Sequence, residues 1–405
     1  GLDAHRSEIL GHMGYPRNWN YWEKLWMTQI LARQIPFVEM TGTAQFFNDA
    51  GPVHVTEALA RGFINRVAEG KGFELDPGNW QRRMLALIDV DDEQFYCLDL
   101  YRILGGRENW WSFHAQEDEG FALSGIKLEK QPSGTLAGAD VAYADRDWLR
   151  KNAEYSETYG FQGPLFGFPH FYNVSRGNPA GIWSADWALK GSGGLHFRLT
   201  LADSGGAQAI VCDAESPAGS SPYEMKWVFL NRSGEAPVQT QICSLMEIYS
   251  DEPVILGVRK LEISPADEAG FPALAIAVSL KDRDDYIFAS SDGGVERMVE
   301  GGFVFAGRFG FFSQKKDGES RLALIGGTRL TRNGIGLKPG APGASRAKIV
   351  ALDHGQNRIT VLPVPDKPET LKGKLVYVTN PSRRIALKVE AARRTARGLE
   401  LDLAT

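Results

Sequence analysis

The chain has 405 residues, of which 43% are hydrophobic and 23% are charged, proportions that are ordinary for a soluble globular protein with room for two or three domains. The formal net charge of −5 argues against a general nucleic-acid binder, which needs a basic surface. No apolar run reaches the roughly 18 to 20 residues of a membrane span, and Cys97, Cys212 and Cys243 are too few for a disulfide framework.

Residues 1–50 are rich in aromatic side chains and show few periodic patterns. Gly14-Tyr15-Pro16 predicts a turn, because the residue before a proline is pushed out of the α-helical region. The apolar spacing in residues 23–34 and in residues 56–69 fits a short helix or a strand equally well. The segment from Gly1 to His5 lacks the pattern of a signal peptide and is typical of the interior of a domain.

Two strands joined by a tight turn are predicted between residues 83 and 103. Arg83–Val90 and Gln94–Ile103 are rich in aliphatic and aromatic residues, and the short acidic segment between them is typical of a β-hairpin. Asp99 and Arg102 interrupt the second run, so we expect one face of this strand to be polar or paired. Gly105-Gly106 should end the strand, because glycine adopts positive φ without steric cost.

A third strand is predicted at Trp110–His114, where two tryptophans stand side by side. Neighbouring residues of a strand point to opposite faces. One indole should therefore be buried, and the other should lie on an open surface or in a cleft.

The rest of the chain alternates short apolar runs with turns that contain glycine or proline. In residues 194–201, His196, Arg198 and Thr200 alternate with apolar residues, so one face of this strand should be exposed to solvent. Short strands continue beyond residue 264. The sequence predicts an all-β protein, with a large antiparallel β-sandwich over residues 1–263 and a smaller C-terminal β-sandwich or β-sheet domain over residues 264–405.

Several of these segments together resemble one family. Leu98–Gly106 followed by Trp110–His114 is similar to the central β-sandwich of heparinase II/III-like polysaccharide lyases, where an aspartate, an aromatic residue, an arginine and two glycines occur in this order. Residues 4–16, which end in Gly-Tyr-Pro, and residues 243–249 and 373–381 also resemble parts of that family.

The resemblance implies a polysaccharide lyase that cleaves an anionic, uronate-containing polysaccharide by β-elimination. In the family, an N-terminal α-helical toroid supplies an Asn or His and a Tyr, and the sandwich supplies a His from a strand that precedes the segment matched here. This chain resembles the strand-built side of the cleft, so the toroid would come from a further domain or a partner chain. The resemblance also implies a periplasmic or extracellular location.

The resemblance and the aromatic strand single out individual residues. The predicted catalytic residues are His12, Tyr21 and Arg33, and the predicted substrate-binding residues are Trp22, Lys24, Trp110, Trp111 and His114. Arginine can clamp a uronate or sulfate with two hydrogen bonds, histidine and tyrosine transfer protons, and indole rings stack on sugars. The alternatives are structural: His12 in a turn, Arg33 on the surface, Tyr21 and Trp22 packed at a sandwich edge, and His114 held by hydrogen bonds.

Zinc-containing members of the family have an aspartate before the Gly-Tyr-Pro and a histidine further along. Here His12 stands at the aspartate position and Arg33 at the histidine position. Histidine binds zinc, whereas arginine does not. His12 cannot close a zinc site on its own, so we expect no bound cofactor unless further ligands come from outside the chain.

Two other interpretations stay open. The replaced metal ligands favour a non-catalytic carbohydrate-binding or structural β-sandwich protein that has lost the active site. The chain could also be a β-sandwich interaction protein with no sugar ligand.

Overall fold

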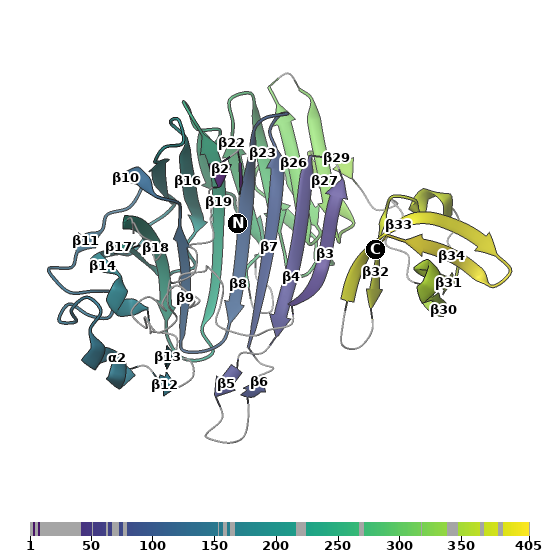
Figure 1. Cartoon of the computed structure of the whole chain (residues 1–405). Coiled ribbons are helices and arrows are strands. Elements are labelled where there is room, and N and C mark those ends of the chain that lie inside the picture. The colour runs from purple at the N-terminus through teal and green to yellow at the C-terminus, as the bar shows by residue number, and fades with distance from the viewer. Residues whose placement is uncertain are drawn as a thin grey trace.

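The computed structural model describes most of the chain. The described residues are Asp3–Ala4 (β1), Ser7–Glu8 (β2), 42–50, 52–61, 64–66, 73–75, 79–152, 154–156, 160–162, 167–215, 224–266, 271–316, 318–337, 347–364, 368–379 and 384–404. They form an all-β protein built from antiparallel sheets, as the sequence predicts (Figure 1).

An eight-stranded sheet in the order β10-β15-β16-β19-β8-β7-β4-β3 forms the centre of the molecule. Its strands are β3 (Gly42–Ala50), β4 (Val53–Arg61), β7 (Trp80–Asp89), β8 (Phe95–Leu104), β10 (Asp118–Ser124), β15 (Trp183–Leu189), β16 (His196–Asp203) and β19 (Gln239–Tyr249). The predicted hairpin is confirmed, because β7 and β8 pair in antiparallel register with Ala86 opposite Leu98. The start of the ambiguous segment 56–69 is strand, since β4 continues to Arg61.

A five-stranded sheet in the order β11-β14-β17-β18-β9, here called the front sheet, packs on one half of the central sheet. Its strands are β9 (Glu108–His114), β11 (Glu129–Lys130), β14 (Tyr172–Gly177), β17 (Gln208–Glu215) and β18 (Glu224–Ser233). Side chains of β8, β15, β16 and β19 meet those of the front sheet in a buried apolar core that contains Trp111, Phe113, Trp187 and Phe197.

The chain crosses from the central sheet to the front sheet at Gly105-Gly106. These glycines have φ values of 138° and 65°, which residues with a Cβ rarely adopt. The N–H of Gly105 donates to the carbonyl of Val238 at 2.9 Å, and the N–H of Val238 donates to the carbonyl of Gly106 at 3.0 Å. The two glycines end β8, as predicted, and turn the chain into β9.

A second sandwich covers the other half of the central sheet from the opposite side. Its strands are β20 (Gly257–Lys260), β21 (Ile263–Ser264), β22 (Leu274–Ser279), β23 (Arg283–Ala289), β24 (Arg297–Val299), β25 (Phe303–Ala306), β26 (Phe309–Lys315), β27 (Ser320–Ile325), β28 (Arg329–Arg332) and β29 (Ile335–Leu337). The sheet β20-β22-β23-β26-β27, here called the rear sheet, contacts the central sheet through a core that includes Val55, Met84, Leu98 and Ile276.

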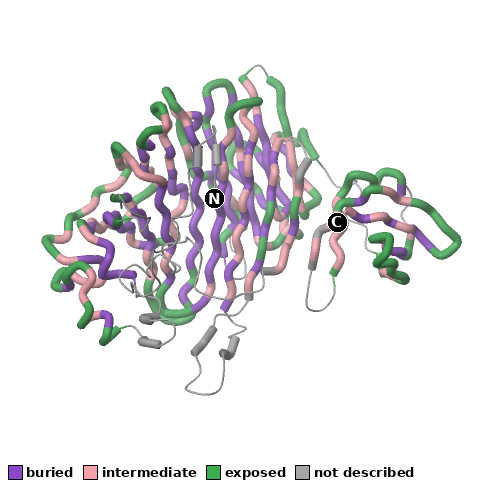
Figure 2. Tube along the Cα trace, viewed as in Figure 1, coloured by how far each residue is buried: buried purple, intermediate pink, exposed green. Residues whose placement is uncertain are grey.

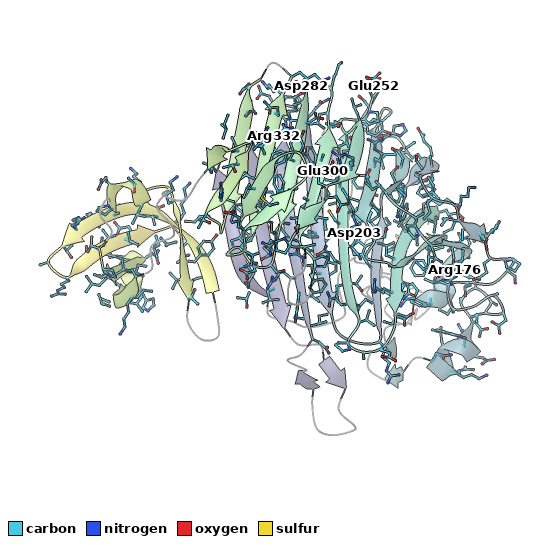
Figure 3. All side chains as sticks on the ribbon, turned by 180° about the vertical axis from the view of Figure 1, so that it is seen from behind. Arg176, Asp203, Glu252, Asp282, Glu300 and Arg332 are labelled. Carbon is cyan, nitrogen blue, oxygen red and sulfur yellow. The ribbon has the colours of Figure 1, made fainter. Side chains whose placement is uncertain are left out.

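The other face of the rear sheet packs on the sheet β21-β24-β25-β28-β29. Figure 3 shows this side of the molecule, with Arg332 and Glu300 labelled. The apolar run at residues 303–312 predicts one continuous strand, and this prediction is wrong, because β25 and β26 belong to different sheets. The chain turns at Gly307, where an added Cβ would lie 2.6 Å from Leu324 Cδ1.

The last sheet has the order β30-β31-β34-β33-β32 and lies beside the edge strand β3 (Figure 1). Its strands are β30 (Lys348–Asp353), β31 (Arg358–Leu362), β32 (Leu375–Thr379), β33 (Arg384–Thr395) and β34 (Gly398–Leu403). The division into domains at residue 263 stays a prediction. Residues 263 and 264 form β21, and the core shared by the central and rear sheets draws on both sides of this position.

The remaining elements are short. They are β5 (Ile64–Arg66), β6 (Phe73–Leu75), β12 (Glu154–Ser156), β13 (Gly160–Gln162), the α-helix α2 (Arg146–Asn152) and the 3-10 helices η2 (Phe168–His170), η3 (His354–Gln356) and η4 (Pro368–Leu371). Within the described ranges, no helix has the length and apolar character needed to cross a membrane.

The front and rear sheets cover different halves of the central sheet, so two areas of that sheet are left partly open. Figure 2 shows the middle strands buried and the flanks more exposed. On the front side, Thr56 and Ala58 of β4 are exposed and Arg83 of β7 is half-buried. On the rear side, Gly120 and Ala122 of β10 are exposed. These areas are the places where the sheet can meet a ligand.

Candidate functional site

Five of the predicted site residues lie outside the described residues. They are His12, Tyr21, Trp22, Lys24 and Arg33. Their catalytic and binding roles, and the metal-ligand role of His12, stay predictions.

The two tryptophans of β9 point to opposite faces of the front sheet, as predicted. Trp111 is 5% exposed and stacks on Phe113 with 5.8 Å between ring centroids, inside the core between the sheets. Trp110 is half-buried on the outer face, where it makes a T-shaped contact with the Phe168 ring, with 4.7 Å between ring centroids. Trp110 is therefore the more accessible of the two rings, and the binding role of both stays a prediction.

His114 ends the same strand on the outer face of the front sheet. It is buried, its ring lies 4.2 Å from that of Trp227, and its Nδ1 is 2.9 Å from the carbonyl oxygen of Ala115. Because a carbonyl oxygen only accepts, Nδ1 carries the proton in this hydrogen bond. The contacts agree with the structural interpretation of His114, and its role in the cleft stays a prediction.

The open area on the front side of the central sheet carries a charged pair. We call this area the Arg83 face and define it by His54, Thr56, Arg83, Cys97 and Asp99, which lie on β4, β7 and β8. The Nε and Nη2 atoms of Arg83 donate to the two carboxylate oxygens of Asp99 at 2.9 and 2.7 Å. The Asp99 side chain is 1% exposed, whereas that of Arg83 is 34% exposed. A buried carboxylate thus fixes a guanidinium that reaches the surface.

The Arg83 guanidinium is also supported by an aromatic ring. Arg83 lies opposite Tyr101 in the β7–β8 register, and its Cζ is 5.5 Å from the centroid of the Tyr101 ring. The Tyr101 hydroxyl donates to Oε1 of Gln81. Burial raises the pKa of Tyr101 above its ordinary value, so the hydroxyl keeps its proton at neutral pH. Asp99 raises the pKa of Arg83, which keeps its charge throughout.

Two further groups complete the Arg83 face. The Nε2 of His54 lies 3.1 Å from Oδ2 of Asp89, and the two side chains are 35% and 44% exposed. Cys97 is half-buried, and burial raises the pKa of its thiol to about 12. This thiol is therefore neutral at physiological pH and is not a nucleophile.

The arginine of the family-like motif points away from this face. The Nε of Arg102 donates to Oε1 of Gln241 at 2.8 Å, and the Arg102 residue is 1% exposed on the rear side of the sheet. Asp99 and Arg102 are thus paired, as expected, but on opposite faces. The motif residues Asp99 and Arg102 build the interior of the sheet, and Arg83 reaches the surface beside them.

Arg83 and His54 are site residues that the sequence patterns do not single out. A usable signal existed in the predicted hairpin, because Arg83 and Asp99 belong to the same alternating set once the strands are paired. His54 carries no such signal, because no strand is predicted at its position. Within the described parts of the chain, no group of three or more His, Cys, Asp and Glu side chains is arranged to hold a metal ion.

The Arg83 face can bind an anion. The Nε and Nη2 atoms are occupied by Asp99, and Nη1 makes no hydrogen bond among the residues that the structure describes. A guanidinium with a free edge, fixed from behind by a buried carboxylate, is a preorganised donor for a carboxylate or sulfate.

Comparison with known proteins gives a distant resemblance in structure. No protein-family model and no curated protein matches the chain. Two solved structures resemble its fold, heparan sulfate lyase HepC from Pedobacter heparinus and a mutant of HepC. Each match has 8% sequence identity and a TM-score of 0.38, and it covers 70% of this chain and 35% of the HepC chain. The match thus spans 35% of the HepC length, and no residue role follows from a likeness at this level.

Proposed function

We propose that this chain is the strand-built part of a polysaccharide lyase that acts on an anionic, uronate-containing polysaccharide. The observation that carries the proposal is the half-exposed Arg83 guanidinium, held by buried Asp99 on an uncovered area of the central sheet. The similarity of Leu98–Gly106 and Trp110–His114 to heparinase II/III-like lyases agrees with it. A uronate polymer lies outside the cytoplasm, so we further propose a periplasmic or extracellular location.

Arg83 supplies the part of β-elimination that a cation can perform. A base removes the proton on the carbon next to the uronate carboxylate, and the electron pair forms a double bond as the glycosidic C–O bond breaks. An acid then protonates the leaving oxygen. Negative charge builds up on the carboxylate as the proton leaves, and a fixed guanidinium stabilises that charge. We propose Arg83 for this role.

We assign proton transfer to residues outside the ranges that the structure describes. Tyr101 keeps its proton because burial raises its pKa, so it does not act as the base at neutral pH. The proposed base and acid are therefore Tyr21 and His12, together with groups from a helical toroid in a further domain or a partner chain. Arg33 is proposed as a second clamp for the anionic polymer.

The test is an assay for unsaturated uronate products by ultraviolet absorbance, with alginate, heparan sulfate, chondroitin, hyaluronan and ulvan as substrates. We expect absorbance to rise with one polymer, and Arg83→Gln to lower kcat/KM by about 10- to 100-fold. Arg329→Gln is the matched control, because Arg329 is 31% exposed and paired with Glu296 on the second sandwich. No absorbance change with any polymer, in the full-length protein with its toroid, would remove the lyase proposal.

A second candidate function is non-catalytic binding of an anionic polysaccharide. The observation that favours it is that both basic side chains of the Arg83 face are already paired with carboxylates, Arg83 with Asp99 and His54 with Asp89. Polymer binding that Arg83→Gln weakens, without any unsaturated product, would establish this function instead.

A further inference from the structure

The rear side of the central sheet has an open area that the lyase proposal does not use. We call it the His196 face and define it by Asp186 of β15, His196 and Arg198 of β16, and Glu247 and Tyr249 of β19. In the strand register, His196 is opposite Tyr249 and Arg198 is opposite Asp186 on one side and Glu247 on the other. Figure 3 views the molecule from this side and labels Asp203, which ends the strand that carries His196.

One carboxylate connects the two ring-bearing residues of this face. The Nδ1 of His196 lies 2.7 Å from Oδ1 of Asp186, and the Tyr249 hydroxyl donates to Oδ2 of Asp186 at 2.5 Å. Burial, followed by the hydrogen bond to Asp186, raises the pKa of Tyr249, so the tyrosine holds its proton. Asp186 therefore accepts from both rings.

The hydrogen bond to Asp186 fixes which nitrogen of His196 meets the ligand. A neutral imidazole carries a single proton, and the carboxylate draws that proton to Nδ1. Nε2 then presents a lone pair, and it makes no hydrogen bond among the residues described by the structure. The His196 side chain is 34% exposed. The face therefore offers an acceptor of fixed direction to solvent.

Stacking and an ion pair hold this acceptor in place. The His196 and Tyr249 rings are nearly parallel, with 18° between their planes and 5.1 Å between centroids. The Cζ of Arg198 lies 5.7 Å from the Tyr249 ring, and its Nε donates to Glu247 at 2.7 Å. The Glu247 side chain is 1% exposed, so this ion pair is anchored in the interior.

The strands beside the rings carry small side chains that leave the sheet accessible. Gly120, Ala122 and Ser124 of β10 are exposed on this side, and Ser184 and Ala188 of β15 are half-buried. The large rings on β16 and β19 therefore lie beside small side chains on β10 and β15. A ligand can lie on the small residues with its edge against Nε2 of His196 and the Tyr249 oxygen.

The charges on the face select the class of ligand. Arg198 is neutralised by Glu247, which leaves the Asp186 carboxylate, with a 17% exposed side chain, as the excess charge. A negative face repels uronates and sulfates, and its acceptors need hydrogen-bond donors. We propose that the His196 face binds a neutral saccharide, with a sugar hydroxyl donating to Nε2 of His196. This site is independent of the anionic polymer proposed for the Arg83 face.

The test follows the imidazole nitrogens of the full chain, labelled with 15N histidine, by long-range 1H–15N spectroscopy. At pH 8, we expect the His196 Nε2 resonance, assigned by its loss in His196→Ala, to lie in the unprotonated range. It should move on addition of at least one of cellohexaose, xylohexaose, mannohexaose and maltohexaose, and no sulfated or uronate hexasaccharide should move it. No shift with any neutral hexasaccharide at millimolar concentration would overturn the proposal, as would a shift with the anionic sugars only.

Variants separate the tautomer argument from a general loss of structure. Asp186→Asn places an amide against Nδ1, which permits the Nε2–H tautomer, and should weaken saccharide binding about three- to tenfold. Tyr249→Phe keeps the ring stack and should weaken binding less. Arg83→Gln should leave saccharide binding unchanged, and His196→Ala should leave lyase activity unchanged. The proposals for the two faces can therefore be tested separately. Full binding by Asp186→Asn, in a variant with wild-type thermal stability, would contradict the fixed acceptor.

Discussion

The hydroxyl of Tyr96 donates a hydrogen bond to Oδ2 of Asp285 at 2.9 Å, in the buried layer between the central and rear sheets. Both residues have no exposed surface. Arg283 reaches the same carboxylate and also donates to the backbone carbonyls of Asp89 and Val90 at 2.7 and 2.8 Å. These contacts join β8 and the end of β7 to β23, so the first and second sandwiches share a polar connection inside an apolar core.

Replacing Tyr96 by Phe should destabilise the fold. The ring still fills its space, but the Asp285 carboxylate loses a donor in a place that water does not reach. We expect the free energy of unfolding to fall by about 1 to 3 kcal/mol. Urea denaturation measures this change. Tyr143→Phe is the control, because Tyr143 is 46% exposed and its hydroxyl is 3.5 Å from Glu215; an equal loss in both variants would contradict the role of the buried bond.

Glu57 should make stability depend on pH. Burial raises its pKa above the ordinary value of 4.5, against the opposing effect of Arg308. The folded state therefore binds the proton more tightly than the unfolded chain. The stabilising contribution is complete below pH 4.5 and is lost as the pH rises through the raised pKa.

The Glu57→Gln variant isolates this contribution. Gln resembles the protonated form of Glu57, so the variant should be about as stable as wild type at pH 4.5 and below. Wild type then loses this contribution as the pH rises and the variant does not, so the variant should become the more stable protein at higher pH. Unfolding free energies at several pH values measure the difference, and a variant that becomes less stable than wild type as the pH rises would show that the Glu57 pKa is lowered instead.

Gly106 and Gly205 should differ in their tolerance of alanine. Both have positive φ, 65° and 61°. A Cβ on Gly106 would meet Glu108 O at 3.7 Å, which is ordinary contact, so Gly106→Ala should cost only the backbone strain of about 1 to 2 kcal/mol. A Cβ on Gly205 would lie 2.4 Å from the carbonyl oxygen of Gln241. Gly205→Ala should therefore lose about 1 to 3 kcal/mol more in the free energy of unfolding, and similar losses would contradict the distinction.

The three thiols should be unreactive in the folded protein. Burial raises the pKa of Cys97 to about 12, and it also raises the pKa values of Cys212 and Cys243. Thiolate is the reactive form, so a thiol reagent at pH 8 should react slowly before unfolding and with all three cysteines after it. Rapid reaction of the native protein would show that one of these thiols is more exposed or more acidic than the structure has it.

The elements that could be predicted from sequence are those with a strong alternating pattern and clear turns. The β7–β8 hairpin, the break at Gly105-Gly106 and the strand at Trp110–His114 all agree with the structure. β19 occupies residues Gln239–Tyr249, the same bounds that its apolar run predicts. Local apolar runs and glycine positions are enough for elements of this kind.

The site could not be predicted to the same extent, because its geometry depends on strand pairing. His196 was expected on a wet face, but its carboxylate partner comes from Asp186 on a neighbouring strand and its stacking partner from Tyr249 on another. Asp99 was expected to be paired, but the identity of Arg83 as its partner needs the hairpin register. The split of residues 303–312 between two sheets likewise depends on tertiary packing around Gly307.

The Tyr377 side chain has a consequence for how this protein behaves in a crowded solution. Its hydroxyl donates to the carbonyl of Phe47 at 2.6 Å and accepts from the N–H of Phe47, on the outermost strand of the central sheet. Open strand margins recruit strands from other molecules, and natural proteins shield them. Deleting the C-terminal sheet would strip this shield from β3, so a truncated chain should self-associate through added strands while the parent protein stays dispersed.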